Sequence, residues 1–179
     1  MMRFTEKYAP ETIADFCGLE EPKRFFTKLA AQPQDDAILC WGPSGTGKTE
    51  MAFAFARAIG AEIVHIPSCK LTAGAVEEIR ATCQYRPMYG KLRVIIADEI
   101  NEGSDRSHDG LLSLLDGSDF PPQTIFIFTC NAEKDDTGKA VIPRNLEPRL
   151  LSRLKQIKFS TYGINGDGSA LLRRVWLAE

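Results

Sequence analysis

The chain has 179 residues, of which 44% are hydrophobic and 26% are charged, and its formal net charge is −2. This length is enough for one well-buried core, and it favours one domain over two. The near-neutral charge argues against a general polyanion binder, so any contact with nucleic acid must come from a local basic face or from several copies acting together.

Strand and helix signals alternate along the chain, which is the pattern of a parallel sheet covered by helices on both faces. The expected helices lie at residues 20–31, 49–59, 72–84, 109–115 and 145–153, the last capped by Asn145. The expected strands lie at 37–41, 61–66, 91–97, 124–129 and 155–160. The sequence therefore predicts an α/β fold with a five-stranded parallel sheet sandwiched by helices.

The C-terminal residues differ in character from this alternating region. Residues 163–168 contain three glycines, which hold regular structure poorly and predict a linker. Residues 169–179 can form about three helical turns with one apolar face. This face either packs back on the main domain or opens a second, helical domain that is missing from this chain.

The N-terminus has no apolar signal core, and no run approaches a transmembrane length. The five cysteines form no CxxC pair and no ligand-spaced cluster with His65 or His108, so reduced and mostly buried thiols are expected. The expected compartment is the cytoplasm, with no membrane partner.

Residues 42–49 form a complete GxxxxGK[ST] phosphate-binding loop between the first expected strand and the next helix. The loop consists of Gly42, Pro43, Ser44, Gly45, Thr46, Gly47, Lys48 and Thr49. The glycines let the backbone fold tightly around an anion, so that amide N–H groups at a helix N-terminus point at a phosphate. Lys48 adds a positive charge, and the Thr49 hydroxyl suits the Mg²⁺ that a triphosphate needs. A nucleoside triphosphate with Mg²⁺ is the expected ligand, and a glycine-rich turn without ligand is the alternative.

Two adjacent carboxylates, Asp98 and Glu99, follow the buried strand expected at 91–97. Successive side chains of a strand diverge, so the two acids can serve different purposes. We expect Asp98 to hold Mg²⁺, directly or through water, and Glu99 to polarise the attacking water. An ordinary acidic strand end is the alternative. The phosphate loop about fifty residues earlier argues against it.

Further segments resemble the AAA+ ATPases, and most closely the DNA clamp loader subunits of the replication factor C and bacterial tau/gamma type. Residues 6–10, 13–18 and 20–21 are similar to the opening of those subunits, which helps to enclose the adenine. The resemblance therefore implies nucleotide contacts for Tyr8, Pro10 and Gly18. Residues 128–131 are similar to the end of the sensor 1 strand, which implies that Asn131 orients the attacking water near the γ-phosphate.

Residues 150–153, followed by 156–159, are similar to the family segment that carries a trans-acting arginine. The resemblance implies that Arg153 reaches the nucleotide of a neighbouring subunit and stabilises charge on the transferred phosphoryl group. Arg149 lies one helical turn earlier on the same face and is the rival candidate. A solvated or carbonyl-capping arginine at the helix end is the alternative for Arg153.

The chain also departs from the family pattern. Ala9 and Leu154 replace an arginine and a cysteine of the clamp loader motifs, and the four-cysteine zinc module of the tau/gamma subunits is absent. The polar loop 133–139 is longer than its counterpart and is expected to be either a solvated loop or a partner contact.

The resemblance implies an ATP-hydrolysing subunit that couples ATP to the loading of a sliding clamp on primer–template DNA. Its partners would be other AAA+ subunits, identical or different, with five as one option. The implied domains are a nucleotide-binding domain at 1–162, a linker at 163–168 and the start of a helical lid at 169–179. Another AAA+ remodeller, such as a branch-migration motor or a protein unfoldase, and a non-hydrolysing assembly subunit are the alternatives.

Overall fold

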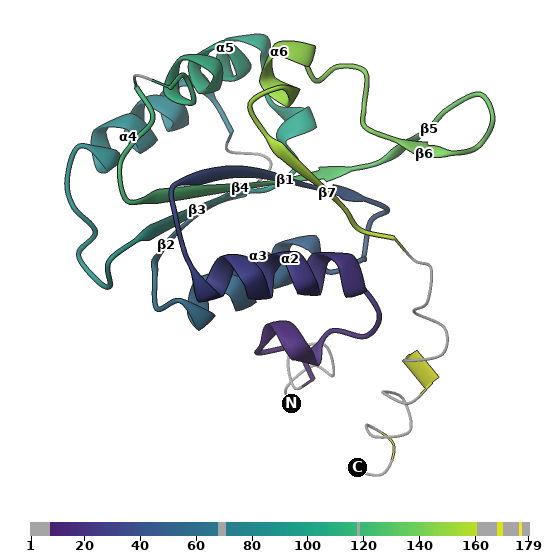
Figure 1. Ribbon diagram of the computed structural model, residues 1–179. Coiled ribbons are helices and arrows are strands. Elements are labelled where there is room, and N and C mark those ends of the chain that lie inside the picture. Colours follow the sequence, from purple (N-terminus) through teal and green to yellow (C-terminus); the bar gives the residue numbers. More distant parts are fainter. Residues whose placement is uncertain (1–7, 68–70, 118, 161–167, 170–175, 177–179) are drawn as a thin grey trace.

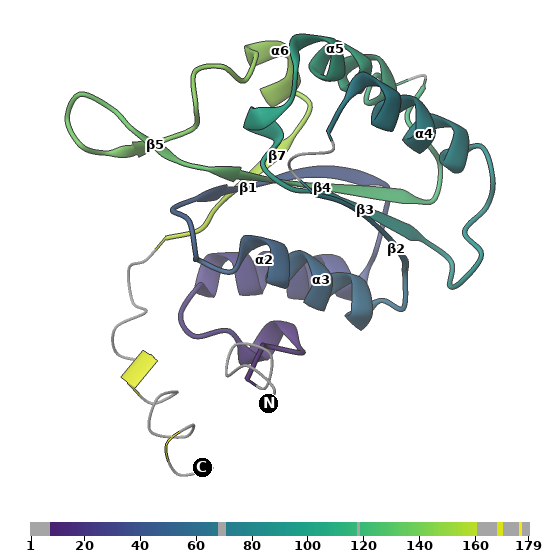
Figure 2. The ribbon, with the colours of Figure 1, turned by 180° about the vertical axis from the view of Figure 1, so that it is seen from behind.

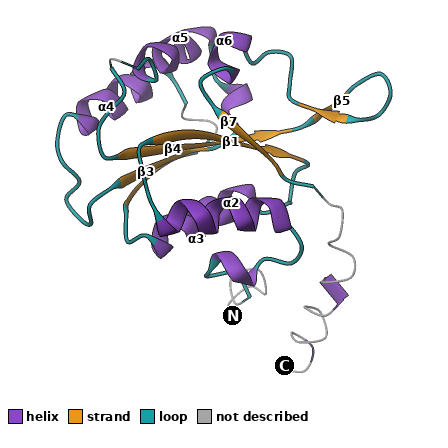
Figure 3. Ribbon diagram, in the orientation of Figure 1, coloured by secondary structure: helices purple, strands orange, loops and turns teal. Residues whose placement is uncertain are grey.

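The computed structural model describes residues 8–67, 71–117, 119–160, 168–169 and 176. In this part of the chain a twisted sheet lies between two layers of helices (Figures 1 and 2). The layer on one face contains α2 (Glu20–Ala31) and α3 (Lys48–Ala58), and the layer on the other face contains α4 (Ala73–Cys83), α5 (Asp105–Leu114) and α6 (Pro148–Leu151) (Figure 3). The predicted α/β sandwich is confirmed.

The main sheet has five strands in the order β2-β3-β4-β1-β7, and all neighbouring strands are parallel. Its strands are β1 (Asp36–Gly42), β2 (Glu62–Ile66), β3 (Arg93–Ala97), β4 (Thr124–Asn131) and β7 (Lys155–Lys158). The five predicted strands are therefore present, with ends that differ by one or a few residues, the usual uncertainty at element ends.

Side chains from the two faces of the sheet enter two separate cores, because successive strand residues point to opposite sides. Ile38 and Cys40 of β1 belong to the core under α2 and α3, whereas Ala37 and Leu39 belong to the core under α4, α5 and α6. Both faces of β1 are thus apolar, which explains why the strand reads as a continuous hydrophobic run.

The strand order places β4 between β1 and β3. Gly42 at the end of β1 pairs with Asn131 at the end of β4, and Ala97 of β3 pairs with Phe128 of β4. The phosphate loop follows β1 and the two acids follow β3, so β4 brings Asn131 between them. This edge of the sheet holds the polar residues that the sequence singled out.

Two helices differ from the expected bounds by more than one residue. Helix α5 begins at Asp105, four residues earlier than expected, because Ser104 caps it through a hydrogen bond from the Ser107 amide to its Oγ (3.3 Å). Its first turn is polar and so carries no apolar periodicity. Helix α6 covers only Pro148–Leu151, and Asn145 does not cap it. The Asn145 amide instead donates to the Asn101 carbonyl (2.6 Å).

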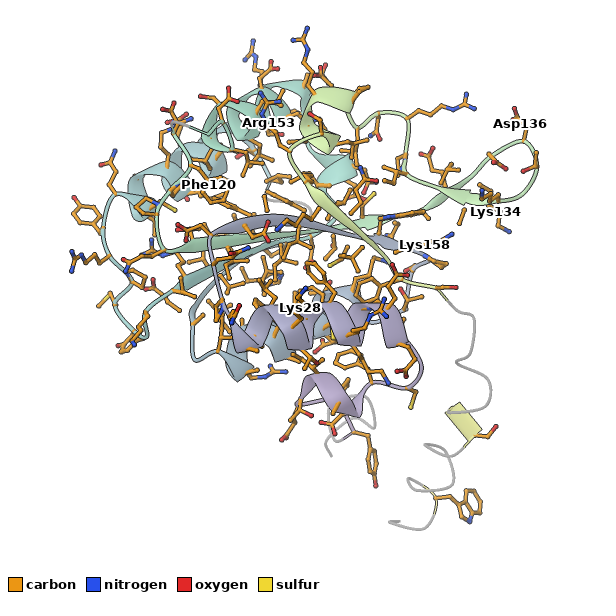
Figure 4. All side chains as sticks on the ribbon, in the orientation of Figure 1. Lys28, Phe120, Lys134, Asp136, Arg153 and Lys158 are labelled. Atoms are coloured by element: carbon orange, nitrogen blue, oxygen red, sulfur yellow. The ribbon has the colours of Figure 1, made fainter. Side chains whose placement is uncertain are left out.

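The segment expected as a loop after β4 contains a small antiparallel hairpin of β5 (Glu133–Lys134) and β6 (Ala140–Val141). Its turn is organised by Asp135, whose Oδ1 accepts from the amides of Thr137 and Lys139, both at 2.9 Å. The Thr137 hydroxyl also donates to it, and these hydrogen bonds hold the pKa of Asp135 below its ordinary value. The hairpin projects from the body of the protein, with Lys134 on strand β5 and Asp136 in the turn beyond it (Figure 4).

The structure also contains the short 3-10 helices η1 (Ile13–Asp15) and η3 (Ile100–Glu102). The predicted linker at 163–168 and the lid helix expected at 169–179 fall outside the described residues, apart from 168–169 and 176. No helix in the described ranges combines the length and the apolar character needed to cross a membrane.

Candidate nucleotide-binding site

The phosphate loop connects β1 to α3, as its sequence context predicts. Gly45 and Gly47 have φ angles of +75° and +80°, a left-handed conformation that glycine adopts without strain. Lys48 is the first residue of α3 and is buried. Its Nζ donates to the carbonyls of Gly42 (3.0 Å) and Pro43 (2.8 Å), so the lysine stem folds back over the loop. The Thr46 hydroxyl also donates to Pro43 (2.8 Å) and tightens this turn.

A hollow of about 330 Å³ lies over the loop. Five loop residues line it, Ser44, Gly45, Gly47, Lys48 and Thr49, together with Glu50, Pro67, Asp98, Glu99, Thr129 and Asn131. Residues from the ends of β1, β3 and β4 therefore meet in one polar cavity. The other three loop residues, Gly42, Pro43 and Thr46, do not line it.

The Asp98 carboxylate is held by side chains from three elements. Its Oδ1 accepts from the Thr49 hydroxyl (2.7 Å) and the Thr129 hydroxyl (3.1 Å). Its Oδ2 lies 2.7 Å from Nε2 of His65 on β2. The hydroxyl of Thr49 and the carboxylate of Asp98 are hard oxygen donors, the kind that Mg²⁺ prefers. The two residues expected to hold Mg²⁺ are thus in direct contact and chemically suited to it.

Glu99, Asn131 and Lys48 form a chain of hydrogen bonds. Asn131 Nδ2 donates to Glu99 Oε1 (2.6 Å), and Lys48 Nζ donates to Asn131 Oδ1 (3.0 Å). The Glu99 backbone is left-handed, with φ of +50°, and its amide donates to the Thr129 hydroxyl (3.0 Å). A non-glycine residue in this conformation is uncommon and is found mostly where the surroundings impose it, as at functional sites.

The electrostatics of the hollow follow from burial and from the two acids. Burial lowers the pKa of Lys48, and the carboxylates of Glu99 and Asp98 oppose this shift. The charge of Glu99 raises the pKa of Glu102, to which Glu99 is also hydrogen-bonded. The site therefore holds a buried cation close to two carboxylates. A phosphate bound beside Lys48 would add negative charge and so favour the charged form of the lysine.

Four residues that the resemblance implicated do not line this hollow. Tyr8, Pro10 and Gly18 belong to the N-terminal segment, which approaches the loop through Phe16: a β-carbon at Gly47 would lie 3.1 Å from Phe16 Cε1. Arg153 lies beside the helical layer of α5 and α6 (Figure 4). It donates to Asp116 Oδ1 from Nε (3.1 Å) and Nη2 (2.7 Å), and to the Arg149 carbonyl (2.9 Å).

Two residues of the site were missed by sequence reasoning. Thr129 contacts both Asp98 and the Glu99 amide, and it becomes visible only when the β3–β4 register is known. His65 was considered only as a member of a metal cluster with cysteines. Its position near the end of the second strand was a usable signal, because the carboxyl ends of parallel strands meet at one edge.

A complete phosphate loop at a helix N-terminus, beside a strand tip that bears two acids, defines this chain as a P-loop nucleotide-binding protein. A family profile described as "ATPase family associated with various cellular activities (AAA)" matches residues 38–162. The chain belongs to this family.

The relatives of the chain include replication factor C subunits. A replication factor C large subunit of Methanosarcina acetivorans is 32% identical over 105 residues, which are 55% of this chain and 17% of that protein. Replication factor C subunit 4 of Caenorhabditis elegans is 30% identical over 176 residues, which are 90% of this chain and 49% of that protein. The chain thus spans about half the length, or less, of these two relatives.

Solved structures show the same fold at low identity. A DNA polymerase III gamma subunit-related protein of Thermotoga maritima superposes with a TM-score of 0.62 at 11% identity, over 79% of this chain and 46% of that one. The RuvB Holliday junction branch migration motor of the same organism superposes with a TM-score of 0.67 at 20% identity, over 87% and 49%. The family match and the aligned relatives, rather than these structures, show that the chain is an AAA+ ATPase related to replication factor C subunits.

Proposed function

We propose that this chain binds ATP with Mg²⁺ and hydrolyses it. The observation that carries the proposal is the hydrogen-bond chain from Lys48 through Asn131 to Glu99. It places a cation, an amide and a candidate base next to one another in the hollow over the phosphate loop. Membership of the AAA family supports the same activity.

The loop amides and Lys48 bind the phosphates. The three ammonium hydrogens of Lys48 have acceptors on Gly42, Pro43 and Asn131, and the lysine exchanges some of them for phosphate oxygens when nucleotide binds. Thr49 and Asp98 would hold Mg²⁺, and the bound ion would neutralise negative charge on the phosphates. The contact of Tyr8, Pro10 and Gly18 with the adenine is part of the same proposal.

Glu99 acts as the base for the attacking water. The Asn131 amide donates to Glu99 Oε1 and so fixes the orientation of the carboxylate. Asn131 also orients the water in line with the γ-phosphate. Catalysis here is mainly positioning and electrostatic stabilisation, because the transferred phosphoryl group needs little covalent help from the protein.

Arg153 completes the site of a neighbouring subunit. Within its own chain Arg153 pairs with Asp116 on an exposed surface, and it does not line the hollow. Such an arginine can stabilise the transition state only if a second subunit presents its nucleotide there. Subunits therefore assemble side by side, identical or different, with five as one option. Arg149 stays the rival candidate.

The work done by ATP is the loading of a sliding clamp on primer–template DNA in the cytoplasm. The names of the relatives support this, since both aligned relatives are replication factor C subunits. A branch-migration motor stays the second candidate because it would use the same nucleotide-binding residues; the likeness to RuvB itself supports the fold alone. Stimulation of turnover by clamp with primed DNA favours the first activity, and stimulation by a four-way junction favours the second.

The nucleotide proposal is tested with Glu99→Gln and the control Glu102→Gln, which removes a neighbouring acid from the same turn. We expect both variants to bind ATP with wild-type affinity by calorimetry. Turnover should fall by about 10²–10⁴-fold in Glu99→Gln and stay near wild type in Glu102→Gln. Absence of Mg²⁺-dependent ATP binding in a folded wild-type sample would overturn the proposal, as would full turnover by Glu99→Gln.

A further inference from the structure

We propose that His65 is a positioning residue for the Asp98 carboxylate and so strengthens Mg²⁺ binding at the nucleotide site. This inference rests on the proposed function and adds a residue to it. The observation behind it is the 2.7 Å contact between His65 Nε2 and Asp98 Oδ2. A carboxylate oxygen can only accept a hydrogen bond, so the ring nitrogen is the donor.

The strand arrangement brings the two residues together. His65 lies in β2, at the edge of the sheet, and pairs in register with Ile96 of β3. The backbone pairing continues past the end of β3, because the Asp98 amide donates to the Ile66 carbonyl (3.0 Å). Asp98 is therefore fixed to β2 by its backbone as well as by its side chain.

The His65 ring is itself supported. It packs against the Phe53 ring of α3, with centroids 5.1 Å apart and planes at 74°. This edge-to-face contact is favourable for aromatic rings and limits rotation of the imidazole. The helix that carries Thr49 therefore also orients the ring that holds Asp98.

The two oxygens of Asp98 have different partners, and this difference gives His65 its effect. Oδ1 faces the hydroxyls of Thr49 and Thr129, while Oδ2 faces His65. The terminal torsion of an aspartate is broad and roughly two-fold, so a carboxylate bonded through one oxygen can rotate. Holding Oδ2 keeps Oδ1 directed at Thr49, where the two metal-binding oxygens must lie together. Hydrogen bonds to ligating groups commonly change metal affinity by about 10–100-fold.

The test measures ADP binding by calorimetry at one pH, once with Mg²⁺ and once with EDTA. His65→Leu should lower the affinity gained from Mg²⁺ by about 10–100-fold, while ADP affinity in EDTA stays within about twofold of wild type. His65→Gln should restore most of the gain, because its side-chain amide reaches about as far as Nε2. His65→Asn, which is shorter, should not restore it. Ile63→Leu, an exposed position on the same face of β2, is the control and should behave like wild type.

Each outcome separates the inference from its alternatives. If Mg²⁺ does not raise the ADP affinity of wild type, the proposed function fails. If Mg²⁺ raises the ADP affinity of wild type and of His65→Leu equally, only the role of His65 fails. Equal losses with Mg²⁺ and with EDTA would mean a structural role and would overturn the inference. A directly coordinated histidine nitrogen, seen by pulsed EPR with Mn²⁺ in place of Mg²⁺, would also overturn it, because His65 would then be a ligand.

Discussion

Arg153 donates two hydrogen bonds to one carboxylate oxygen of Asp116, at 3.1 Å from Nε and 2.7 Å from Nη2. Both side chains stay partly exposed, with 32% of the arginine and 58% of the aspartate accessible. An exposed ion pair of this kind contributes at most about 1 kcal/mol to stability. The pair is therefore better suited to orienting the guanidinium at the surface than to holding the fold together.

The first prediction concerns this arginine. Arg153→Ala should leave the free energy of unfolding within about 1 kcal/mol of wild type, since it breaks an exposed pair. Nucleotide affinity of the isolated chain should not change, because Arg153 does not line the hollow. Turnover in the assembly should fall by about three to five orders of magnitude if the arginine acts in trans. Calorimetry and steady-state ATPase assays measure these effects.

Asp116→Asn and Arg149→Ala are the comparison variants. Asp116→Asn keeps the shape but removes the charge that orients Arg153, so its loss of turnover should be smaller than that of Arg153→Ala. Mixing wild-type and Arg153→Ala chains should reduce turnover beyond simple dilution, because each variant chain spoils a neighbouring site. A severe loss in Arg149→Ala with a mild one in Arg153→Ala would assign the trans role to Arg149.

The second prediction concerns Asn131, which lies between Lys48 and Glu99. Asn131→Ala should lower kcat by about 10²-fold or more with little change in KM, because it removes a donor that acts on the base and the water. Asn131→Asp places a second carboxylate next to Glu99, and like charges raise the pKa of one of the pair. The pH–rate profile of Asn131→Asp should therefore shift its rising limb to higher pH, and a profile that overlays wild type would contradict this geometry.

The third prediction separates two glycines of the phosphate loop by their surroundings. A β-carbon at Gly42 would lie 2.1 Å from the Phe159 carbonyl oxygen, whereas one at Gly45 would meet nothing within 4 Å. Gly42→Ala should therefore force β1 and the end of β7 apart and lower the free energy of unfolding by about 1–3 kcal/mol or more. Gly45→Ala should cost only the strain of its positive φ, about 1–2 kcal/mol.

Nucleotide binding gives a second measurement on the same pair. Gly45 lines the hollow and Gly42 does not. Gly45→Ala should therefore weaken ADP binding more than Gly42→Ala does, although it destabilises the fold less. Chemical denaturation and calorimetry on both variants provide the comparison. Equal stability losses, with no difference in ADP affinity, would show that the loop moves to accept either side chain.

The phosphate loop and the two acids could be predicted from the sequence because their chemistry is encoded locally. The loop needs glycines at fixed offsets and a helix after them, and Asp98 and Glu99 follow a continuous apolar strand. The central strands β1, β3 and β4 were predictable for the same reason, since they are buried on both faces and read as largely hydrophobic runs, whereas the edge strands β2 and β7 are partly exposed. These features depend on near neighbours in the chain.

The rest depends on strand order and register, which local patterns do not contain. Thr129 and His65 reach Asp98 only because β4 and β2 both flank β3. The Asp116 contact of Arg153 joins residues 37 positions apart in the chain. The β5–β6 hairpin was expected as a loop because its strands are two residues long and its turn is organised by a side chain, Asp135.

The last prediction concerns the buried thiol of Cys130, next to Asn131 on β4. Burial raises its pKa from 9.0 to about 12, and Lys48 only partly opposes this. Below pH 9 the thiol is protonated in both the folded and the unfolded chain, so its contribution to stability is complete. Between pH 9 and about 12 the unfolded chain loses this proton and the folded chain keeps it. The free energy of unfolding should therefore fall with rising pH in this window, by at most about 1.4 kcal/mol per pH unit from this group.

Cys130→Ala removes the titrating group, so its unfolding free energy should fall less steeply above pH 9 than that of wild type. The comparison uses the slopes from urea denaturation, because the substitution can also shift stability by an amount that does not depend on pH. Cys17 is half-buried and provides a contrast in reactivity: iodoacetamide at pH 8 should modify Cys17 in the folded protein well before Cys130. Parallel slopes in wild type and Cys130→Ala, or rapid alkylation of Cys130 in the folded chain, would mean that the carboxyl end of β4 opens to solvent.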